Sequence, residues 1–319
     1  MVELGERMGL DLLAIDTETT GVGWYDDAFM ISIAGYEAFV FDKRIMHIGE
    51  WEDTIKFVHH LLAEADRIIM HNAKFDIQKL CRLGIPLSVF IGKFEDTQAL
   101  AHLIDEHQST SLKFLARKYL GETTDEDEVL KTYRRKAKLK KEDGYEPIPH
   151  DILAPYAFKD AEFTLALYNK LFPLLSEDLY PLYDLEKRMT ISLLSVEAKG
   201  LSVDRAYVTA KRKEYGDKIY QTKARIAKLS GPDFNPQSPA QVVAALEERG
   251  IRVGKTDKAT LASVDDELAS LIVELREANK IKATYFDAMY EESKNGILHP
   301  NFRQHGTRTG RMSSGSVDT

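Results

Sequence analysis

The chain has 319 residues, of which 44% are hydrophobic and 29% are charged, and its formal net charge is -8 at pH 7. This length exceeds what one core usually supports, so we expect two domains of an ordinary soluble, globular protein. A uniformly acidic field repels phosphate, which excludes a surface that coats nucleic acid and restricts any such contact to a local site. The single cysteine, Cys81, excludes an internal disulfide and a cysteine-rich zinc site and favours a reducing compartment.

The first half of the chain alternates between strand-like and helix-like segments. Apolar runs of strand length occupy residues 12–15, 30–34, 38–41 and 67–70. Apolar residues recur at helical spacing in 51–65 and 73–83, and Gly84 and Pro86 end the second of these patterns. The alternation predicts an α/β domain, in which helices flank a sheet.

The second half is dominated by helical patterns. The longest of them occupy residues 151–171, 182–198, 206–227 and 268–290. Ser238 and Pro239 have the preferences of an N-cap and a first helical position, and Gly250 ends the helix that they open. We therefore expect the α/β domain to span residues 1–175 and a mostly helical region to follow over 176–295.

Acidic residues stand at the ends of two predicted strands. Asp16 and Glu18 end the first strand, where alternation puts side chains i and i+2 on one face, so both carboxylates can point at one ion. A lone pair of this kind is weak evidence, because an acidic chain contains several by chance. Asn72 ends another strand, and Asp76 follows it by one helical turn. Taken alone, Asn72 is better interpreted as a helix cap, although its amide can also hydrogen-bond a nucleotide.

A phenol and a carboxylate share one face of a later predicted helix, because Tyr156 and Asp160 are four residues apart. Taken alone, the pair Asp16 and Glu18 and the pair Tyr156 and Asp160 are each best interpreted as exposed polar residues. Four carboxylates and a tyrosine in this order nevertheless fit a two-metal phosphodiesterase. Two divalent ions about 3.5–4 Å apart can generate the attacking hydroxide and stabilise the leaving alkoxide. Hard oxygen ligands favour Mg²⁺ or Mn²⁺, and the scattered histidines do not suggest zinc.

The motifs DTET at 16–19, HNAKFD at 71–76 and YAFKD at 156–160 resemble the three exonuclease motifs of the DEDD superfamily, in its tyrosine-containing branch. The resemblance implies a ribonuclease H-like fold with 3′-5′ exonuclease activity and the metal ligands Asp16, Glu18, Asp76 and Asp160. It implies that Tyr156, with Glu18, orients the attacking water and that Asn72 holds the terminal nucleotide. Asp96 falls where the family often has a further acid, and we leave its role open. Val22 or Trp24 could stack on the terminal base, but Val22 is better interpreted as a loop residue covering the core.

The second half of the chain resembles family A DNA polymerases. Residues 183–204 resemble the helix that leads into the thumb, FNPQSP at 234–239 resembles the thumb turn, and TGRMSS at 309–314 resembles the segment that enters the palm. This resemblance implies a thumb-like region over 176–295, the start of a palm over 296–319, and contact of Arg311 with the primer end in the minor groove. Without the resemblance, a Gly-Arg-Ser run near a terminus is interpreted as a flexible tail.

The sequence stops at Thr319, before the motifs that carry nucleotidyl transfer in such polymerases. We therefore expect no primer extension from this chain alone, and two explanations stay open. The chain is a fragment of a longer enzyme, or it belongs to a split polymerase whose second chain carries palm and fingers. The expected partner is DNA, as a single-stranded 3′ end or a primer-template. No stretch approaches the ~20 apolar residues of a membrane span, so we expect a cytoplasmic protein of a bacterium or a phage-infected cell, with no membrane partner.

Two other functions remain open at this point. One is RNA trimming by a ribonuclease D-like exonuclease, and the other is a non-catalytic subunit of a split polymerase that only holds DNA. The complete set of acids favours catalysis, and the thumb-like second half favours DNA as the substrate. The basic strip at 131–141 is either a solvated helix face or a surface that tracks phosphates beside the active site.

Overall fold

The computed structural model describes residues 11–35, 37–122, 125–140 and 143–315. The chain forms two compact units, one made of Met1–Lys199 with Pro300–Thr319 and the other of Gly200–His299. The first unit contains the helices α1 Ile48–Glu64, α2 Ala73–Arg82, α3 Thr97–Ile104, α4 Leu112–Leu115, α5 Asp125–Lys136, α6 His150–Leu171 and α7 Tyr180–Lys199. The second contains α8 Arg205–Ser230, α9 Pro239–Glu247, α10 Lys258–Ala262, α11 Glu267–Ile281 and α12 Ala288–Glu292. Within the described ranges, none of these helices combines the length and the apolar character needed to cross a membrane.

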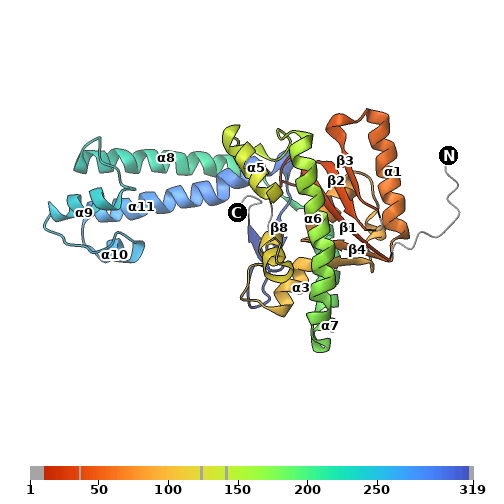
Figure 1. Cartoon of the computed structure of the whole chain (residues 1–319). Helices are drawn as coiled ribbons and strands as arrows, with labels where there is room; N and C mark the ends of the chain where they lie inside the picture. The colour runs from red at the N-terminus through yellow and green to blue at the C-terminus, as the bar shows by residue number, and fades with distance from the viewer. Residues whose placement is uncertain (1–10, 36, 123–124, 141–142, 316–319) are drawn as a thin grey trace. The chain divides into compact units, whose positions relative to one another are not determined.

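A five-stranded mixed sheet forms the centre of the first unit (Figure 1). Its strands are β1 Leu12–Thr19, β2 Ala28–Ala34, β3 Phe39–Asp42, β4 Arg67–Met70 and β5 Phe94–Asp96. Their order is β3-β2-β1-β4-β5, in which β2 is antiparallel to β3 and β1, and β4 is parallel to β1 and β5. The predicted fold class, a mixed sheet flanked by helices and followed by a helical region, is confirmed.

Helices cover both faces of this sheet, and the side chains of β1 alternate between them. Leu13 and Ile15 pack into one core with α1 and α2, whereas Ala14 packs into another with α3 and α6. Figure 1 shows α6 on one side of the sheet and α1 on the opposite side. By the same alternation, the side chains of Asp16 and Glu18 lie on the face that α6 covers.

Helix α6 is fixed to the sheet beside the end of β1. The hydroxyl of Ser32 on β2 donates to the carbonyl oxygen of Ala157, at 2.9 Å, and Ser32 is the cross-strand partner of Asp16. Met30, the partner of Glu18, packs in one apolar cluster with Tyr156 of this helix. The middle of α6 is therefore held opposite the two acids of β1.

Helix α7, the last helix of the first unit, packs against α2 and α3. It is joined to α2 by Lys74, whose ammonium contacts the carboxylate of Glu197 and lies 3.0 Å from Oδ1 of Asn301. That asparagine begins a hairpin of β8 Asn301–Arg303 and β9 Ser313–Gly315, whose strands pair antiparallel. The division into functional domains at residues 175 and 295 stays a prediction.

The second unit is mainly helical and has its own apolar core. Helices α8 and α11 lie side by side, and residues of α8, α9, α10 and α11 form one buried cluster (Figure 1). Ser238 accepts a hydrogen bond from the amide of Gln241 and Pro239 opens α9, as the sequence predicts. Two short strands, β6 Leu201–Ser202 and β7 Ile297–Leu298, pair antiparallel where the chain enters and leaves this unit.

Candidate active site

Two carboxylates project from the end of β1. Glu18 is buried and Asp16 is half-buried, and both lie on the face of the sheet that α6 covers. The pairing of β1 with β2 shifts between Glu18 and Thr19, so the regular ladder ends at this point. Such an irregularity re-aims side chains at the end of a strand. Asp16 and Glu18 therefore lie on one face of the sheet, close to the point where the regular pairing of β1 with β2 ends.

A third carboxylate is tied directly to β1. Oδ1 of Asp76, in the first turn of α2, accepts the amide of Thr17 at 3.0 Å and the hydroxyl of Thr17 at 2.7 Å. Because Thr17 lies between Asp16 and Glu18 in the sequence, these two bonds fix Asp76 next to the acids of β1. The prediction that the first two motifs meet at one place therefore agrees with the geometry.

The turn before α2 is held by another buried acid, Asp96, which is not one of the predicted metal ligands. Asn72 occupies the N-cap position in the left-handed region, with φ 65° and ψ 54°, and its side chain makes no capping bond and is exposed. Asp96 instead accepts the amides of Asn72 and Ala73, at 3.1 and 2.9 Å, while it also caps α3. The amide side chain of Asn72 is therefore left free of a capping role beside Asp76.

Tyr156 and Asp160 face the acids of β1 from α6. Both are buried, and the hydroxyl of Tyr156 hydrogen-bonds the carboxylate of Asp160 one turn later. The ammonium of Lys113, on α4, contacts the same carboxylate and lies 4.2 Å from the centroid of the Tyr156 ring. A cation therefore sits among the acidic side chains of the site.

Burial and mutual repulsion favour the protonated forms of these carboxylates. Burial, followed by the charges of the neighbouring acids, raises the pKa of Asp16 and that of Glu18 well above their usual values. Burial raises the pKa of Asp76 to about 7, although the bonds from Thr17 oppose the shift. Burial also raises the pKa of Asp160, and the Lys113 ammonium opposes it. Such a cluster gains stability from any positive charge placed in it.

The donors of the cluster are hard carboxylate oxygens, the ligand type that Mg²⁺ and Mn²⁺ prefer. Across the described ranges, however, no group of three or more histidine, cysteine or acidic side chains is arranged so that it could hold an ion. Oδ1 of Asp76 is occupied by Thr17, and Asp160 is in contact with Lys113. The donor chemistry fits divalent ions, and binding two of them requires local movement of side chains such as Lys113.

Comparison with protein-family models identifies the family of this chain. Residues 3–176 match the model of a family described as 3′-5′ exonuclease. The chain belongs to this 3′-5′ exonuclease family. Residues 205–317 also match the model of DNA polymerase family A, which confirms the resemblance to family A DNA polymerases that the sequence predicts.

Two of the relatives similar to this chain are named as DNA polymerases, and a solved structure shares its fold. The chain is 29% identical to DNA polymerase DpoZ of Vibrio phage phiVC8 over 358 residues, covering 97% of this chain and 56% of the relative. It is 29% identical to DNA polymerase I of Borreliella burgdorferi over 322 residues, covering 95% of this chain and 34% of the relative. The chain therefore spans about half or less of these relatives' length. The POL domain of Pol1 from M. smegmatis, solved with DNA primer-template and dNTP, shares the fold, with a TM-score of 0.67 at 21% identity over 98% of this chain and 51% of that one.

One predicted contact residue of the exonuclease chain lies elsewhere in the first unit. Arg311 is exposed between β8 and β9, where its carbonyl oxygen accepts the hydroxyl of Thr307 at 2.6 Å. The alternative interpretation of this run as a flexible tail is not supported, because residues 313–315 pair with β8 in a hairpin. A contact of Arg311 with DNA stays a prediction.

Two residues near the exonuclease motifs were not expected from the sequence. Lys113 is 47 residues from Asp160, and nothing in its local pattern distinguishes it from a solvated lysine. Tyr145 stacks on Tyr156, with ring centroids 6.0 Å apart, and precedes α6 in an irregular segment. No periodic pattern marks either position, because both depend on contacts across the fold.

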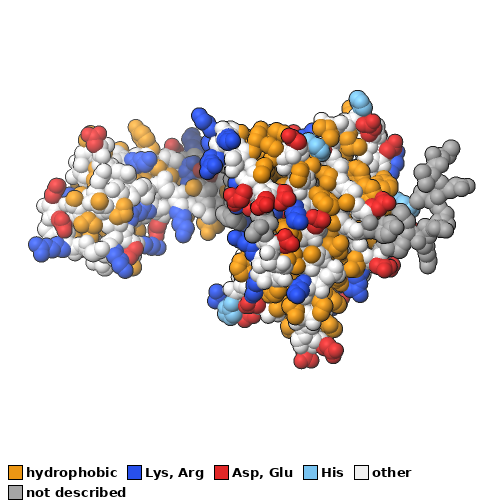
Figure 2. Space-filling model, viewed as in Figure 1, with side chains coloured by type: hydrophobic (Ala, Val, Ile, Leu, Met, Phe, Trp, Pro, Cys, Tyr) orange, Lys and Arg blue, Asp and Glu red, His pale blue; other side chains and the backbone are white. Residues whose placement is uncertain are grey.

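The basic strip of the exonuclease unit has mixed surroundings. Lys131 on α5 pairs with Asp127 and Glu128, at 2.8 and 3.2 Å. Arg134 points inward and donates to the carbonyl oxygen of Gly144 at 2.6 Å. Figure 2 shows acidic and basic side chains interspersed on the visible face, without one broad basic surface. Part of the strip is thus structural, and a phosphate-tracking role for the remainder stays a prediction.

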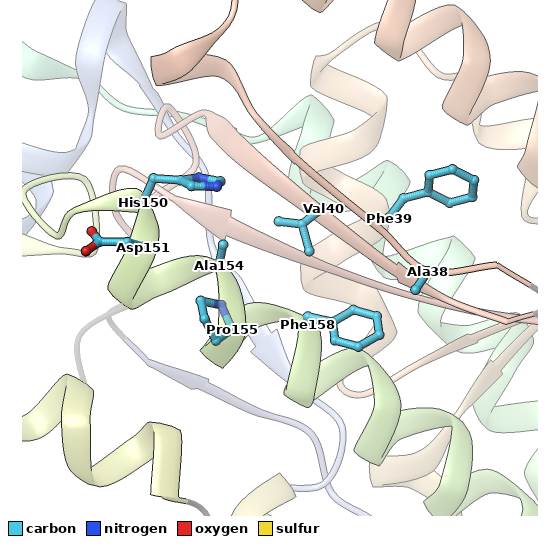
Figure 3. A pocket seen from close by; sticks show the side chains of 8 residues that line it. All are labelled: Ala38, Phe39, Val40, His150, Asp151, Ala154, Pro155 and Phe158. Atoms are coloured by element: carbon cyan, nitrogen blue, oxygen red, sulfur yellow. The ribbon is translucent and has the colours of Figure 1, made fainter.

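An apolar pocket lies beside α6 but outside the acidic cluster (Figure 3). Its lining residues are Ala38, Phe39, Val40, His150, Asp151, Ala154, Pro155 and Phe158. None of the four clustered carboxylates lines it, and His150 is held by Asp42 at 2.9 Å. The acidic cluster at the end of β1 therefore remains the candidate site for chemistry.

Proposed function

We propose that this chain removes nucleotides from the 3′ ends of DNA by two-metal hydrolysis, as the proofreading part of a family A DNA polymerase. The observation that carries the proposal is the clustering of four carboxylates from β1, α2 and α6, of which Glu18, Asp76 and Asp160 are buried and Asp16 is half-buried. Membership of the 3′-5′ exonuclease family supports it. The names of the relatives, DNA polymerase DpoZ and DNA polymerase I, support DNA as the substrate.

The proposed roles follow from where each side chain lies. Asp16, Glu18, Asp76 and Asp160 would hold two Mg²⁺ or Mn²⁺ ions, which would supply a Lewis acid on each side of the scissile phosphate. Tyr156, on the helix opposite β1, would orient the attacking water together with Glu18. The exposed amide of Asn72 would hydrogen-bond the terminal nucleotide.

The polymerase side of the protein is also part of the proposal. The match of residues 205–317 to DNA polymerase family A supports a thumb-like role for the second unit and contact of Arg311 with a primer-template. We propose that palm and fingers complete the enzyme, on a longer polypeptide or on a second chain. A cytoplasmic site of action, in a bacterium or a phage-infected cell, is consistent with bacterial and phage relatives.

The test uses one oligonucleotide sequence made as DNA and as RNA, labelled at the 5′ end, with the purified chain and Mg²⁺. The proposal predicts stepwise shortening of DNA from its 3′ end, absent in Asp16→Ala and retained in a control with an exposed acid removed, Asp53→Ala. Faster digestion of RNA than of DNA would instead support the ribonuclease D-like function. Binding of the DNA oligonucleotide without digestion of either the DNA or the RNA would support a subunit that only holds DNA.

A further inference from the structure

Beside Tyr156 lies a second tyrosine that no motif includes. The ring of Tyr145 stacks on that of Tyr156 at an interplanar angle of 26°, and the two hydroxyls hydrogen-bond. Both rings belong to the apolar cluster that also contains Phe29 and Met30. The two phenols thus meet at the edge of the acidic cluster, within the electrostatic influence of Glu18 and Asp160.

The position of Tyr145 is fixed by the segment that carries it. Gly144 has a φ of +65°, and a Cβ there would lie 2.6 Å from the carbonyl oxygen of Thr20, so only glycine fits against the end of β1. Arg134 donates to the carbonyl oxygen of Gly144 at 2.6 Å, and its guanidinium lies 5.6 Å from the centroid of the Tyr145 ring. The segment is therefore held against both β1 and α5.

The other side of the segment is held as firmly. Arg44 donates to the carbonyl oxygen of Glu146 at 2.8 Å and also to that of Ile148, while Asp42 binds its guanidinium through both oxygens. The amide of Ile148 donates to the carbonyl oxygen of Tyr145 at 3.0 Å. With backbone and ring both restrained, the Tyr145 hydroxyl has little freedom to leave Tyr156.

The Tyr156 hydroxyl lies between two partners. It hydrogen-bonds the carboxylate of Asp160 one turn later on α6 and the hydroxyl of Tyr145. A hydroxyl bound by two partners is restricted in both position and rotation. Without the Tyr145 hydroxyl, the Tyr156 hydroxyl would be held by Asp160 alone.

We infer that Tyr145 is a positioning residue of the hydrolytic site, which holds the hydroxyl of Tyr156 in the orientation needed to place the attacking water. This inference rests on the proposed exonuclease function. Tyr145 acts through its hydroxyl, so Tyr145→Phe removes the proposed contact while the stacked ring and its packing stay. Loss of one neutral hydrogen bond corresponds to a decrease in kcat of about 3- to 10-fold, with KM for DNA within about 2-fold of wild type.

The experiment is a double-mutant cycle on 3′-end digestion of single-stranded DNA with Mg²⁺, using Tyr145→Phe, Tyr156→Phe and the double variant. We expect Tyr145→Phe to slow kcat in the wild-type background and to change nothing further in the Tyr156→Phe background. Tyr133→Phe, in the same apolar cluster, is the matched control and keeps the wild-type rate. Melting temperatures of all variants report whether packing is intact.

Several results would overturn the inference. A wild-type kcat in Tyr145→Phe would show that the Tyr145 hydroxyl has no role in hydrolysis. An equal decrease in kcat in both backgrounds would show that Tyr145 does not act through Tyr156. A lowered melting temperature together with equal slowing by Tyr133→Phe would reduce Tyr145 to packing. Failure of the proposed function is distinguishable from all of these, because wild type itself then digests no DNA.

Discussion

Replacing Asp96 by alanine tests how the turn before α2 is positioned. The carboxylate is buried, with 5% of the residue exposed, and accepts four backbone amides. Its donors are the amides of Asn72, Ala73, Gln98 and Ala99, at 3.1, 2.9, 2.8 and 3.4 Å. One side chain thus caps α3 and also fixes the left-handed turn that starts α2.

The cost of this substitution can be assembled from its parts. Loss of the N-cap of α3 costs about 1 kcal/mol. The amide of Ala73 is buried and would be left without an acceptor, which adds about 1–3 kcal/mol. The amide of Asn72 is close to solvent and adds little. We therefore expect Asp96→Ala to lower the free energy of unfolding by roughly 3 kcal/mol.

Urea unfolding followed by tryptophan fluorescence measures this loss, because both tryptophans, Trp24 and Trp51, belong to the first unit. Asp105→Ala at the other end of α3 is the control, since its side chain is 39% exposed. It should cost less than about 1 kcal/mol. If Asp96→Ala costs no more than Asp105→Ala, the carboxylate does not hold the turn, and the account of α2 is wrong.

Three further substitutions test other buried charges. Lys79 is fully buried, and burial lowers its pKa to about 8 from 10.5. Between these two pH values the unfolded chain binds more protons than the folded chain, so the folded state gains stability as the pH rises. In urea titrations, the free energy of unfolding of wild type relative to that of Lys79→Met should rise by up to roughly 3 kcal/mol between pH 7 and 10.5. A constant difference would contradict this sign. Lys113→Met leaves Asp160 without its charged donor and should lower the free energy of unfolding by about 1–3 kcal/mol in EDTA. In saturating Mg²⁺ the loss should be smaller, and equal losses in both buffers would argue against ion binding at Asp160. Glu197→Gln leaves the ammonium of Lys74 without its charged partner and should cost about 3 kcal/mol by thermal or urea unfolding, whereas a loss under 1 kcal/mol would show that the pair is solvated.

Sequence periodicity was sufficient for most of the sheet and its helices. Strands β1, β2 and β4 are apolar runs whose side chains are mostly buried on both faces, and β3 is a partly buried apolar run, so these patterns stand out from their neighbours. Strand β5 has three residues, Phe94–Asp96, and two of them are acidic. A run this short carries no period, and only its parallel pairing with β4 makes it a strand. Strands β8 and β9 are also too short to show a period in the sequence.

The three sequence motifs identified the acids because each stands at the end of a periodic element. The structure brings Asp16, Glu18, Asp76 and Asp160 together, and their catalytic roles stay a prediction. Lys113 and Tyr145 could not be found in the same way, because their importance comes from contacts between distant segments. Tyr145 depends on Gly144 and on two arginines, and no local pattern predicts that these converge.

The most direct test of the central claim is the single-turnover rate of 3′ nucleotide release from single-stranded DNA with Mg²⁺, for wild type, Asp160→Asn and the exposed-acid control Asp53→Asn. Stabilisation by a bound ion is worth several kcal/mol, so we expect Asp160→Asn to be slower by at least about 100-fold, while Asp53→Asn matches wild type. A wild-type rate in Asp160→Asn, or no release by wild type, would contradict hydrolysis at the four-carboxylate site.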